Sequence, residues 1–143
     1  MSIKPQFAEA ILDGRKRVEF RKRRLAPDVT TVLVYTTMPT GLVTGTFEIS
    51  GYDVGSPTKI WELHKAHGGI ARSGYRAYFQ GAPTAVGIRV GRVCRLATPI
   101  RLEDVSPGLR APQSFIYLDS SQVADLVTTQ AGTESSPPSH QAA

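Results

Sequence analysis

Two strand-forming segments that follow one another closely constrain the fold of this chain most strongly. The first, VTTVLVYTT at residues 29–37, is rich in β-branched residues and almost wholly apolar in its middle, which predicts a strand covered on both faces. The second, LVTGTFEIS at residues 42–50, alternates between apolar and polar residues, as a strand with one buried face does. Only residues 38–41 link the two segments, and we place both in one sheet.

Short helices are predicted around these strands. Helical patterns occur at residues 5–14, 56–68 and 68–81, and further strand patterns at residues 17–21, 85–96 and 112–118. Strands and short helices without a regular βαβ alternation are typical of an α+β fold. We therefore predict a curved, mostly antiparallel sheet or small β-barrel flanked by short helices.

Length and composition indicate one soluble domain. The chain has 143 residues, 41% of them hydrophobic and 20% charged, which is typical of a globular protein with a single core. Its single cysteine, Cys94, excludes an intramolecular disulfide framework and a cysteine-rich zinc site. The sequence shows no signal-peptide pattern and no apolar run long enough to span a membrane. We expect a cytoplasmic protein, and the sequence does not define its oligomeric state.

The folded domain is predicted to cover residues 1–118. Residues 119–143 contain no Lys or Arg, and their second half is rich in Ser, Thr, Gln and Pro. A segment of this composition buries too little apolar surface to fold. We therefore expect a largely flexible tail at residues 119–143.

Positive charge is concentrated near the amino terminus. The whole chain carries a net charge of +5, and residues 1–24 contain eight basic but only three acidic side chains. A basic pole of this kind favours an anionic partner, and nucleic acid is the commonest such partner. The alternative is a solvated surface that only aids solubility.

One acidic residue, Glu19, lies inside the basic run LDGRKRVEFRKRR at residues 12–24. In a strand at residues 17–21, Arg17, Glu19 and Arg21 share one face, and neighbours on that face are about 7 Å apart. Arg21 and Arg17 can then keep Glu19 charged and oriented, while Glu19 directs their guanidinium groups at a phosphate or base. The alternative is a surface ion pair of little energetic value.

Lys16 precedes this strand and is open to two interpretations. Its neighbours Arg15 and Arg17 are expected to lower its pKa toward a range in which the neutral amine acts as a base. Glu19 acts in the opposite direction, and a charged Lys16 would instead bind phosphate or stabilise a developing anion. The sequence supports both roles.

Five segments, taken in order, resemble a known family. The first contains the pattern Gly14-x-Lys16-x-x-Glu19-x-Arg21, and the others are VLVYTTMPTGLVTGTFEI, SPTKIWELHKAHGGI, AYFQG and the pair PIRLEDV and APQSFIYL. Over about residues 2–118 these segments are similar to ASCH domains of the stand-alone bacterial type, a branch of the PUA-like superfamily. The resemblance implies a small β-barrel with a cleft that binds RNA or nucleotides, preferably single-stranded.

The resemblance also suggests a set of site residues. Lys16 and Glu19 are the candidate catalytic residues, and the candidate binding residues are Lys4, Arg21, Tyr35, Thr36, Thr37, Gln113 and Ser114. Their hydroxyl and amide groups suit base edges or a 2′-hydroxyl. For Tyr35 the alternative is a core tyrosine with a satisfied hydroxyl.

Other polar residues are given simpler roles. Phosphate steering without sequence readout is expected of Lys22, Arg23, Arg24, Arg89, Arg92 and Arg95. His64 and His67 lie three positions apart on a predicted helix but lack a third ligand at a recognisable spacing, so we expect both at the surface. Any catalysis would use Lys, Glu and hydroxyl groups, with Mg²⁺ as an optional, loosely held cofactor.

Three functions remain open at this point. The chain is an RNA-binding domain without chemistry, a small ribonuclease, or an amidohydrolase that deacetylates N4-acetylcytidine. Glu19 stands where deacetylating ASCH members have the threonine that attacks the acetyl group. Thr36 or Ser114 would have to take over the role of that threonine here. The ribonuclease interpretation has its own departure, because Thr40 and Gly41 stand where a basic residue often follows the Tyr-x-Thr-x-Pro segment. We favour RNA binding, with ribonuclease activity to be tested.

Overall fold

The structure, a computed structural model, describes residues 1–119 and 121. The predicted tail at residues 119–143 therefore lies almost wholly outside the described residues. In the described part, no helix is long and apolar enough to cross a membrane.

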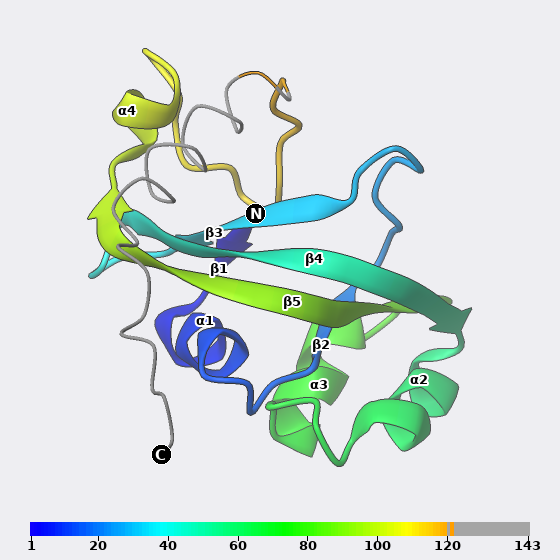
Figure 1. The fold of residues 1–143 in the computed structure, drawn as a ribbon. Helices are drawn as coiled ribbons and strands as arrows, with labels where there is room; N and C mark the ends of the chain where they lie inside the picture. Colours follow the sequence, from blue (N-terminus) through cyan, green and yellow to red (C-terminus); the bar gives the residue numbers. More distant parts are fainter. Residues whose placement is uncertain (120, 122–143) are drawn as a thin grey trace, which may run out of the picture.

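A five-stranded sheet and four short helices form the described part of the chain (Figure 1). The strands are β1 (Ser2–Ile3), β2 (Val18–Arg21), β3 (Thr31–Thr36), β4 (Leu42–Gly55) and β5 (Ala85–Ile100). The helices are α1 (Pro5–Leu12), α2 (Pro57–His64), α3 (Arg72–Phe79) and α4 (Leu102–Val105). This arrangement confirms the predicted α+β fold class.

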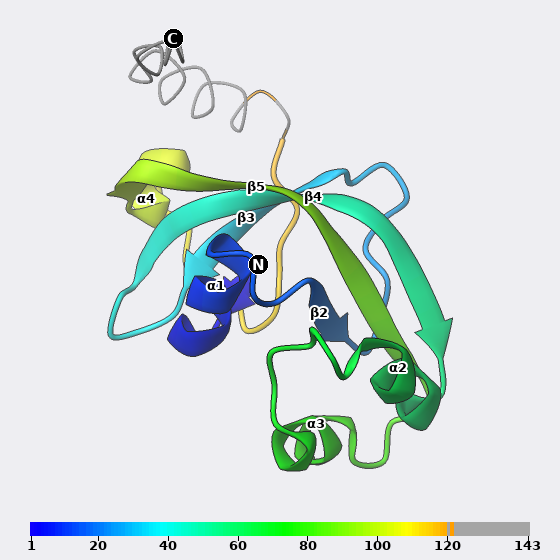
Figure 2. The same cartoon turned by 60° about the horizontal axis from the view of Figure 1, so that its bottom comes forward.

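The sheet has the strand order β1-β3-β4-β5-β2. All neighbouring pairs are antiparallel except β1 and β3, which are parallel. The long strands β4 and β5 arch across the whole molecule (Figure 2), and their pairing shifts register in several places, such as between Phe47 and Ile49. These irregularities increase local twist and bend the sheet.

The curved sheet is not closed into a barrel by its backbone. Its edge strands are β1 and β2, and in the described chain no backbone ladder joins them. A side chain bridges the gap instead, because Arg21 on β2 donates a hydrogen bond from Nη2 to the carbonyl oxygen of Ser2 on β1, at 3.0 Å. Arg21 therefore links the two edges of the sheet.

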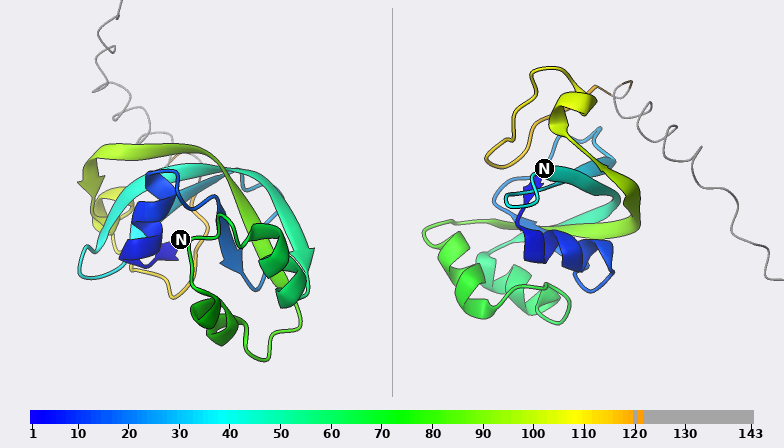
Figure 3. Two further views of the ribbon diagram at one scale, coloured as in Figure 1. Left: turned by 90° about the horizontal axis from the view of Figure 1, so that it is seen from below. Right: turned by 90° about the vertical axis from the view of Figure 1, so that its left-hand side faces the viewer.

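Helices cover the sheet unequally on its two sides. α1, α2 and α3 lie on one side of the arch, and α4 lies on the other (Figures 1 and 3). α1 has Pro5 in its first turn and is followed by Gly14 at φ 85°, as the sequence pattern predicts. Ser56 caps α2 by accepting a hydrogen bond from the backbone N–H of Lys59 at 3.2 Å.

Two apolar clusters hold these layers together. Ile11 of α1 packs with Val34, Phe47 and Ile88 of the sheet, and all four are fully buried. The second cluster joins β2 and β5 to α2 and α3 through Val18, Phe20, Ile60, Tyr75, Phe79 and Ala85. Burial of such side chains provides the main driving force for folding.

The predicted strand at residues 112–118 is wrong. This segment has no regular secondary structure and instead runs beside the short strand β1. The backbone N–H of Ser2 donates to the carbonyl oxygen of Ser114 at 2.8 Å. The Ser2 hydroxyl donates to the carbonyl oxygen of Pro112 at 2.6 Å. β1 has only two residues, which is too short to support a further paired strand.

Candidate functional site

A largely buried network of three charged residues lies on and beside β2. Glu19 Oε1 is 3.2 Å from Nη2 of Arg21, and Glu19 Oε2 is 3.8 Å from Nζ of Lys16. The three side chains are only 3–11% exposed. The strand pattern predicted Arg17 as the second cation beside Glu19, but Arg17 is exposed. Lys16 lies beside Glu19 in its place. Burial protects these pairs from screening by salt.

Lys16 is enclosed by the segment that follows α2. Its ammonium donates a hydrogen bond to the carbonyl oxygen of Gly68. It also lies 5.0 Å from the ring centroid of Phe20 and 5.4 Å from that of Phe7, where cation–π attraction is effective. Gly69 adopts φ +64°, and a Cβ there would lie 2.9 Å from the Lys16 side chain. Both properties require glycine at position 69.

Burial is the main influence on the pKa of Lys16. It lowers the pKa below the ordinary lysine value, Glu19 raises it, and Arg21 lowers it further. The direction agrees with one of the two sequence interpretations, but the cause is desolvation rather than the neighbouring arginines. Local sequence could not reveal this cause, because Gly68 closes over Lys16 from 52 positions away.

Arg21 connects the charged network to the carboxyl-terminal segment. Its Nη1 donates to the hydroxyl oxygen of Ser114 at 3.0 Å, and its Nη2 donates to the Ser2 carbonyl. Since Ser114 Oγ accepts this bond, its own hydrogen remains free to be donated. Within the described residues, Glu19 Oε2 and Arg21 Nε are buried without a hydrogen-bond partner. Such unsatisfied groups are rare in folded proteins.

The predicted residues at the end of β3 have different surroundings. The Thr36 and Thr44 hydroxyls are hydrogen-bonded to each other at 2.7 Å, and Thr36 is buried. Thr37 is half-buried after the end of β3. Tyr35 is 9% exposed and packs against Val43 and Val105, in agreement with a partly core role.

Tyr35 also lines a cavity of about 830 Å³. One wall is formed by β3 and the residues that precede it, and the other by α4 and the segment that ends at Asp119. Pro112 and Phe115 belong to that second wall, and Ser114 lies between them in the chain. The lining is mostly apolar and partly aromatic, which suits a planar ring such as a nucleobase.

The structure brings only part of the predicted site together. Ser2 pairs with Tyr35 on one side of β1, and its backbone N–H donates to the carbonyl oxygen of Ser114 on the other. The Cα atoms of Tyr35 and Ser114 are therefore about 10 Å apart, which is two strand spacings. Lys16, Glu19, Arg21 and Ser114 form one connected network. Gln113 and Lys4 are exposed, and in the part of the chain that is described neither has a side-chain hydrogen bond or ion pair that joins it to this network.

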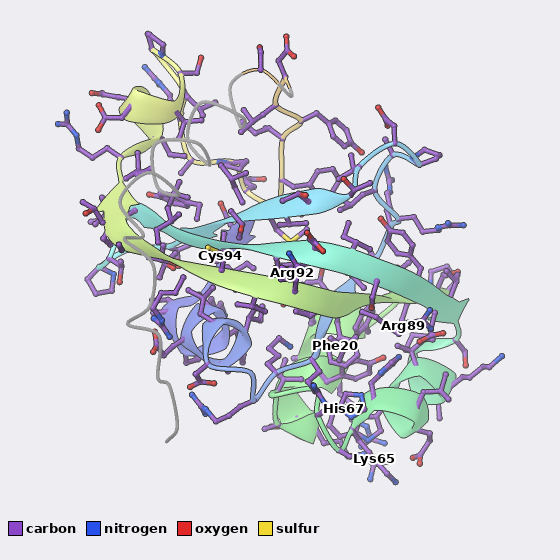
Figure 4. The ribbon with its side chains drawn as sticks, viewed as in Figure 1. Phe20, Lys65, His67, Arg89, Arg92 and Cys94 are labelled. Atoms are coloured by element: carbon purple, nitrogen blue, oxygen red, sulfur yellow. The ribbon has the colours of Figure 1, made fainter. Side chains whose placement is uncertain are left out.

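The prediction that His64 lies at the surface is wrong. His64 is 6% exposed. Its Nε2 is 2.7 Å from Oδ2 of Asp53, and its Nδ1 is 3.2 Å from Nε2 of His67. Arg89 completes the group, since its Nη1 is 2.9 Å from Oδ1 of Asp53. Figure 4 shows Arg89 on β5 and His67 below it. Asp53 is 11 positions from His64, and no local spacing signals their contact.

The residues described do not form a metal site. Across residues 1–119 there is no group of three or more His, Cys, Asp and Glu side chains that could hold a metal ion. Mg²⁺ is usually held by only one or two protein carboxylates together with water and substrate phosphates, and a comparison of RNA cleavage in Mg²⁺ and in EDTA tests whether this protein uses it.

Fold and sequence together define the class of this protein. A family model described as the ASCH domain matches residues 1–94, and the chain belongs to the ASCH domain family. The ASCH domain-containing ribonuclease of Zymomonas mobilis is 28% identical over 137 residues, which cover 94% of this chain and 93% of that protein. The crystal structure of ASCH from Zymomonas mobilis has a TM-score of 0.82 at 27% identity, covering 90% of this chain and 92% of that chain.

Crystal structures of two variants of the Zymomonas mobilis protein are equally similar. In one, a serine is replaced by alanine, and the TM-score is 0.83 at 26% identity. In the other, a tyrosine is replaced by phenylalanine, and the TM-score is 0.81 at 26% identity. Both match 90% of this chain, so the similarity covers nearly the whole of its described part.

Proposed function

We propose that this protein binds single-stranded RNA and cleaves its phosphodiester bonds. The observation that carries the proposal is the hydrogen bond from Arg21 to Ser114, a hydroxyl donor whose chain neighbour Phe115 lines the 830 Å³ cavity. The near full-length similarity to a protein named as a ribonuclease supports it. The proposed setting is the cytoplasm.

In this proposal a nucleobase enters the cavity and the neighbouring phosphate lies at Ser114. When an oxygen nucleophile attacks phosphorus and gives up its proton to solvent, the bond to the leaving oxygen breaks and that oxygen takes a proton from solvent. During this exchange negative charge grows on the non-bridging oxygens. Ser114 donates its hydroxyl hydrogen to one of these oxygens, and Tyr35 donates to another part of the nucleotide. Donors that are already oriented stabilise such charge effectively. Gln113 and Thr37 are near these groups in sequence, and Lys4 follows Ile3, which pairs with Thr36; all three are proposed to contact flanking nucleotides.

Lys16 and Glu19 are assigned positioning roles because both are buried. The Glu19 oxygen that faces Lys16 has no accessible surface, so a substrate cannot reach it in this conformation. Glu19 instead holds the Arg21 fork in the orientation that serves Ser114, and Lys16 holds the other Glu19 oxygen. This assignment revises the catalytic roles predicted for Lys16 and Glu19.

The two Zymomonas mobilis variants support the choice of contact residues. They replace a serine and a tyrosine, the residue types that Ser114 and Tyr35 provide here. Thr36, one of the two residues that could replace the missing threonine in deacetylation, is buried and bonded to Thr44, so its hydroxyl does not favour an acetyl carbonyl as substrate.

The test uses end-labelled single-stranded RNA, incubated with the protein in Mg²⁺ or in EDTA. Cleavage is expected in the wild-type protein and is expected to fall in Ser114→Ala and Tyr35→Phe, while RNA affinity changes little. Lys16→Ala and Glu19→Ala are expected to lower both activity and stability. Activity in EDTA measures directly whether a divalent ion contributes.

Each alternative function has its own outcome in the same experiment. RNA binding without cleavage would select a binding domain and overturn the ribonuclease proposal. Release of acetate from N4-acetylcytidine would select the amidohydrolase. Affinity that does not change with salt would argue against phosphate contacts altogether. Cleavage that survives all four substitutions would remove the proposed site.

A further inference from the structure

A second pocket lies at the end of β2, next to the loop that joins α3 to β5. It has a volume of about 460 Å³ and is lined by Lys22, Arg23 and residues 80–84. Both cations are exposed, and none of the described lining residues is acidic. The volume lies in the range of small-molecule sites, so the pocket is large enough to receive part of a nucleotide.

In the described part of the chain Lys22 and Arg23 have no ion-pair partner, unlike several other cations on the surface. Ion pairs join Arg15 to Asp13, Lys65 to Glu62, Arg89 to Asp53, Arg95 to Glu9 and Arg101 to Asp104. Among the residues that the structure describes, no carboxylate forms such a pair with Lys22 or Arg23. Their charge is therefore available to an anionic ligand.

An aromatic side chain holds Lys22 in place at this pocket. The Lys22 ammonium lies 5.0 Å from the ring centroid of Tyr78, and Tyr78 is 40% exposed. The Tyr78 ring packs edge-on against the buried Phe79, with 4.7 Å between centroids. Lys22 is thus supported by a residue anchored in the core, which limits the freedom it loses on binding a ligand.

We infer that this pocket binds a backbone phosphate of the RNA, apart from the phosphate at Ser114. The inference rests on the proposed function. Arg21 is the last residue of β2, and Lys22 and Arg23 form the bend that follows it. Because Ser114 is bonded to Arg21 at the end of β2 and Lys22 with Arg23 come directly after Arg21, one RNA strand that passes the end of this edge strand reaches both sites.

The test measures RNA affinity as a function of salt for Lys22→Gln/Arg23→Gln and for a charge-matched control. The control is Lys59→Gln/Arg110→Gln, whose residues are exposed and lie outside both pockets. The probe is a fluorescein-labelled oligouridylate of about ten nucleotides. Loss of this one phosphate contact is expected to weaken binding about tenfold and to reduce the salt slope by about 0.7, whereas the control changes both less.

The outcomes separate this inference from the proposed function. If the wild-type protein binds no RNA, the proposed function fails, and the inference fails with it. If the wild-type protein binds RNA but the two double variants lose equal affinity, only the inference fails. A specific loss in Lys22→Gln/Arg23→Gln, with an unchanged free energy of unfolding, supports the pocket as a phosphate site.

Discussion

Arg21 donates a hydrogen bond to the Ser114 hydroxyl over 3.0 Å, although the two residues are 93 positions apart. The same guanidinium contacts Ser2 and Glu19. One side chain therefore joins the two edges of the sheet and also orients the hydroxyl that we propose as the phosphate donor. Stability and function are coupled at this residue, and variants are needed that separate them.

Arg21→Lys is expected to lower the free energy of unfolding by about 2 kcal/mol, because lysine keeps the charge but cannot donate to Ser114 and Ser2 together. Urea unfolding measures this change. The exposed Arg92→Lys is the matched control and is expected to have no effect. If Arg21→Lys is as stable as the wild-type protein, the side chain does not bridge the sheet.

Ser114→Ala is expected to reduce RNA cleavage about 100-fold, as the loss of one oriented donor does in other enzymes. The free energy of unfolding is expected to fall by only about 1 kcal/mol, since Arg21 keeps its hydrogen bond to Ser2 and its ion pair with Glu19. Cleavage rates and urea unfolding are measured on the same preparation. Full activity in this variant would show that Ser114 does not contact the reacting phosphate.

Lys16→Ala is expected to lower the free energy of unfolding by about 3 kcal/mol, because it removes one partner of a buried ion pair. The effect depends on pH with a definite sign. Burial lowers the pKa of Lys16, so the unfolded chain binds more protons between the folded pKa and about 10.4. The stability contributed by Lys16 therefore rises with pH in that interval.

This pH dependence is checked by urea unfolding of both proteins between pH 7 and about 10. The stability difference between wild type and Lys16→Ala is expected to widen as pH rises. Tyr75, whose pKa burial raises to about 12, is common to both proteins and cancels in the difference. A gap that narrows with rising pH would contradict the assigned direction.

Asp53→Asn is expected to make stability less sensitive to acid. Burial raises the pKa of Asp53, but its bonds to His64 and Arg89 outweigh burial and lower the pKa overall. The stability from this carboxylate is thus present above the unfolded value of about 3.9 and lost as pH falls through the lower folded value. Acid unfolding is followed by circular dichroism in both proteins. The loss of stability on acidification is expected to be smaller in Asp53→Asn than in the wild-type protein.

Gly87→Ala is expected to destabilise the fold by about 2 kcal/mol. A Cβ at position 87 would lie 3.1 Å from Cδ2 of His64 and 3.2 Å from Val18, and His64 is held by Asp53 and His67. Gly74→Ala is the control, because its nearest contact would be an ordinary 3.5 Å to Ile70. Within α3 this change should stabilise by about 0.5–1 kcal/mol. Equal effects of the two variants would contradict the packing described.

Much of the fold was predictable from the sequence because it depends on residues close together in the chain. Pro5 and Gly14 bound α1, Ser56 caps α2, and the alternating pattern of residues 42–50 is part of β4. The segment at residues 112–118 was mispredicted as a strand because its pattern carries no information about the length of β1, its partner.

The α+β class, the basic pole and the closeness of Lys16, Glu19 and Arg21 in the chain all follow from local sequence. In contrast, the burial of Lys16 by Gly68, the bond from Arg21 to Ser114 and the enclosure of His64 beside Asp53 arise from packing between distant segments. Local patterns reflect backbone preference and periodicity, whereas burial and pKa depend on which distant segments close over a side chain. That closure is a property of the packed molecule.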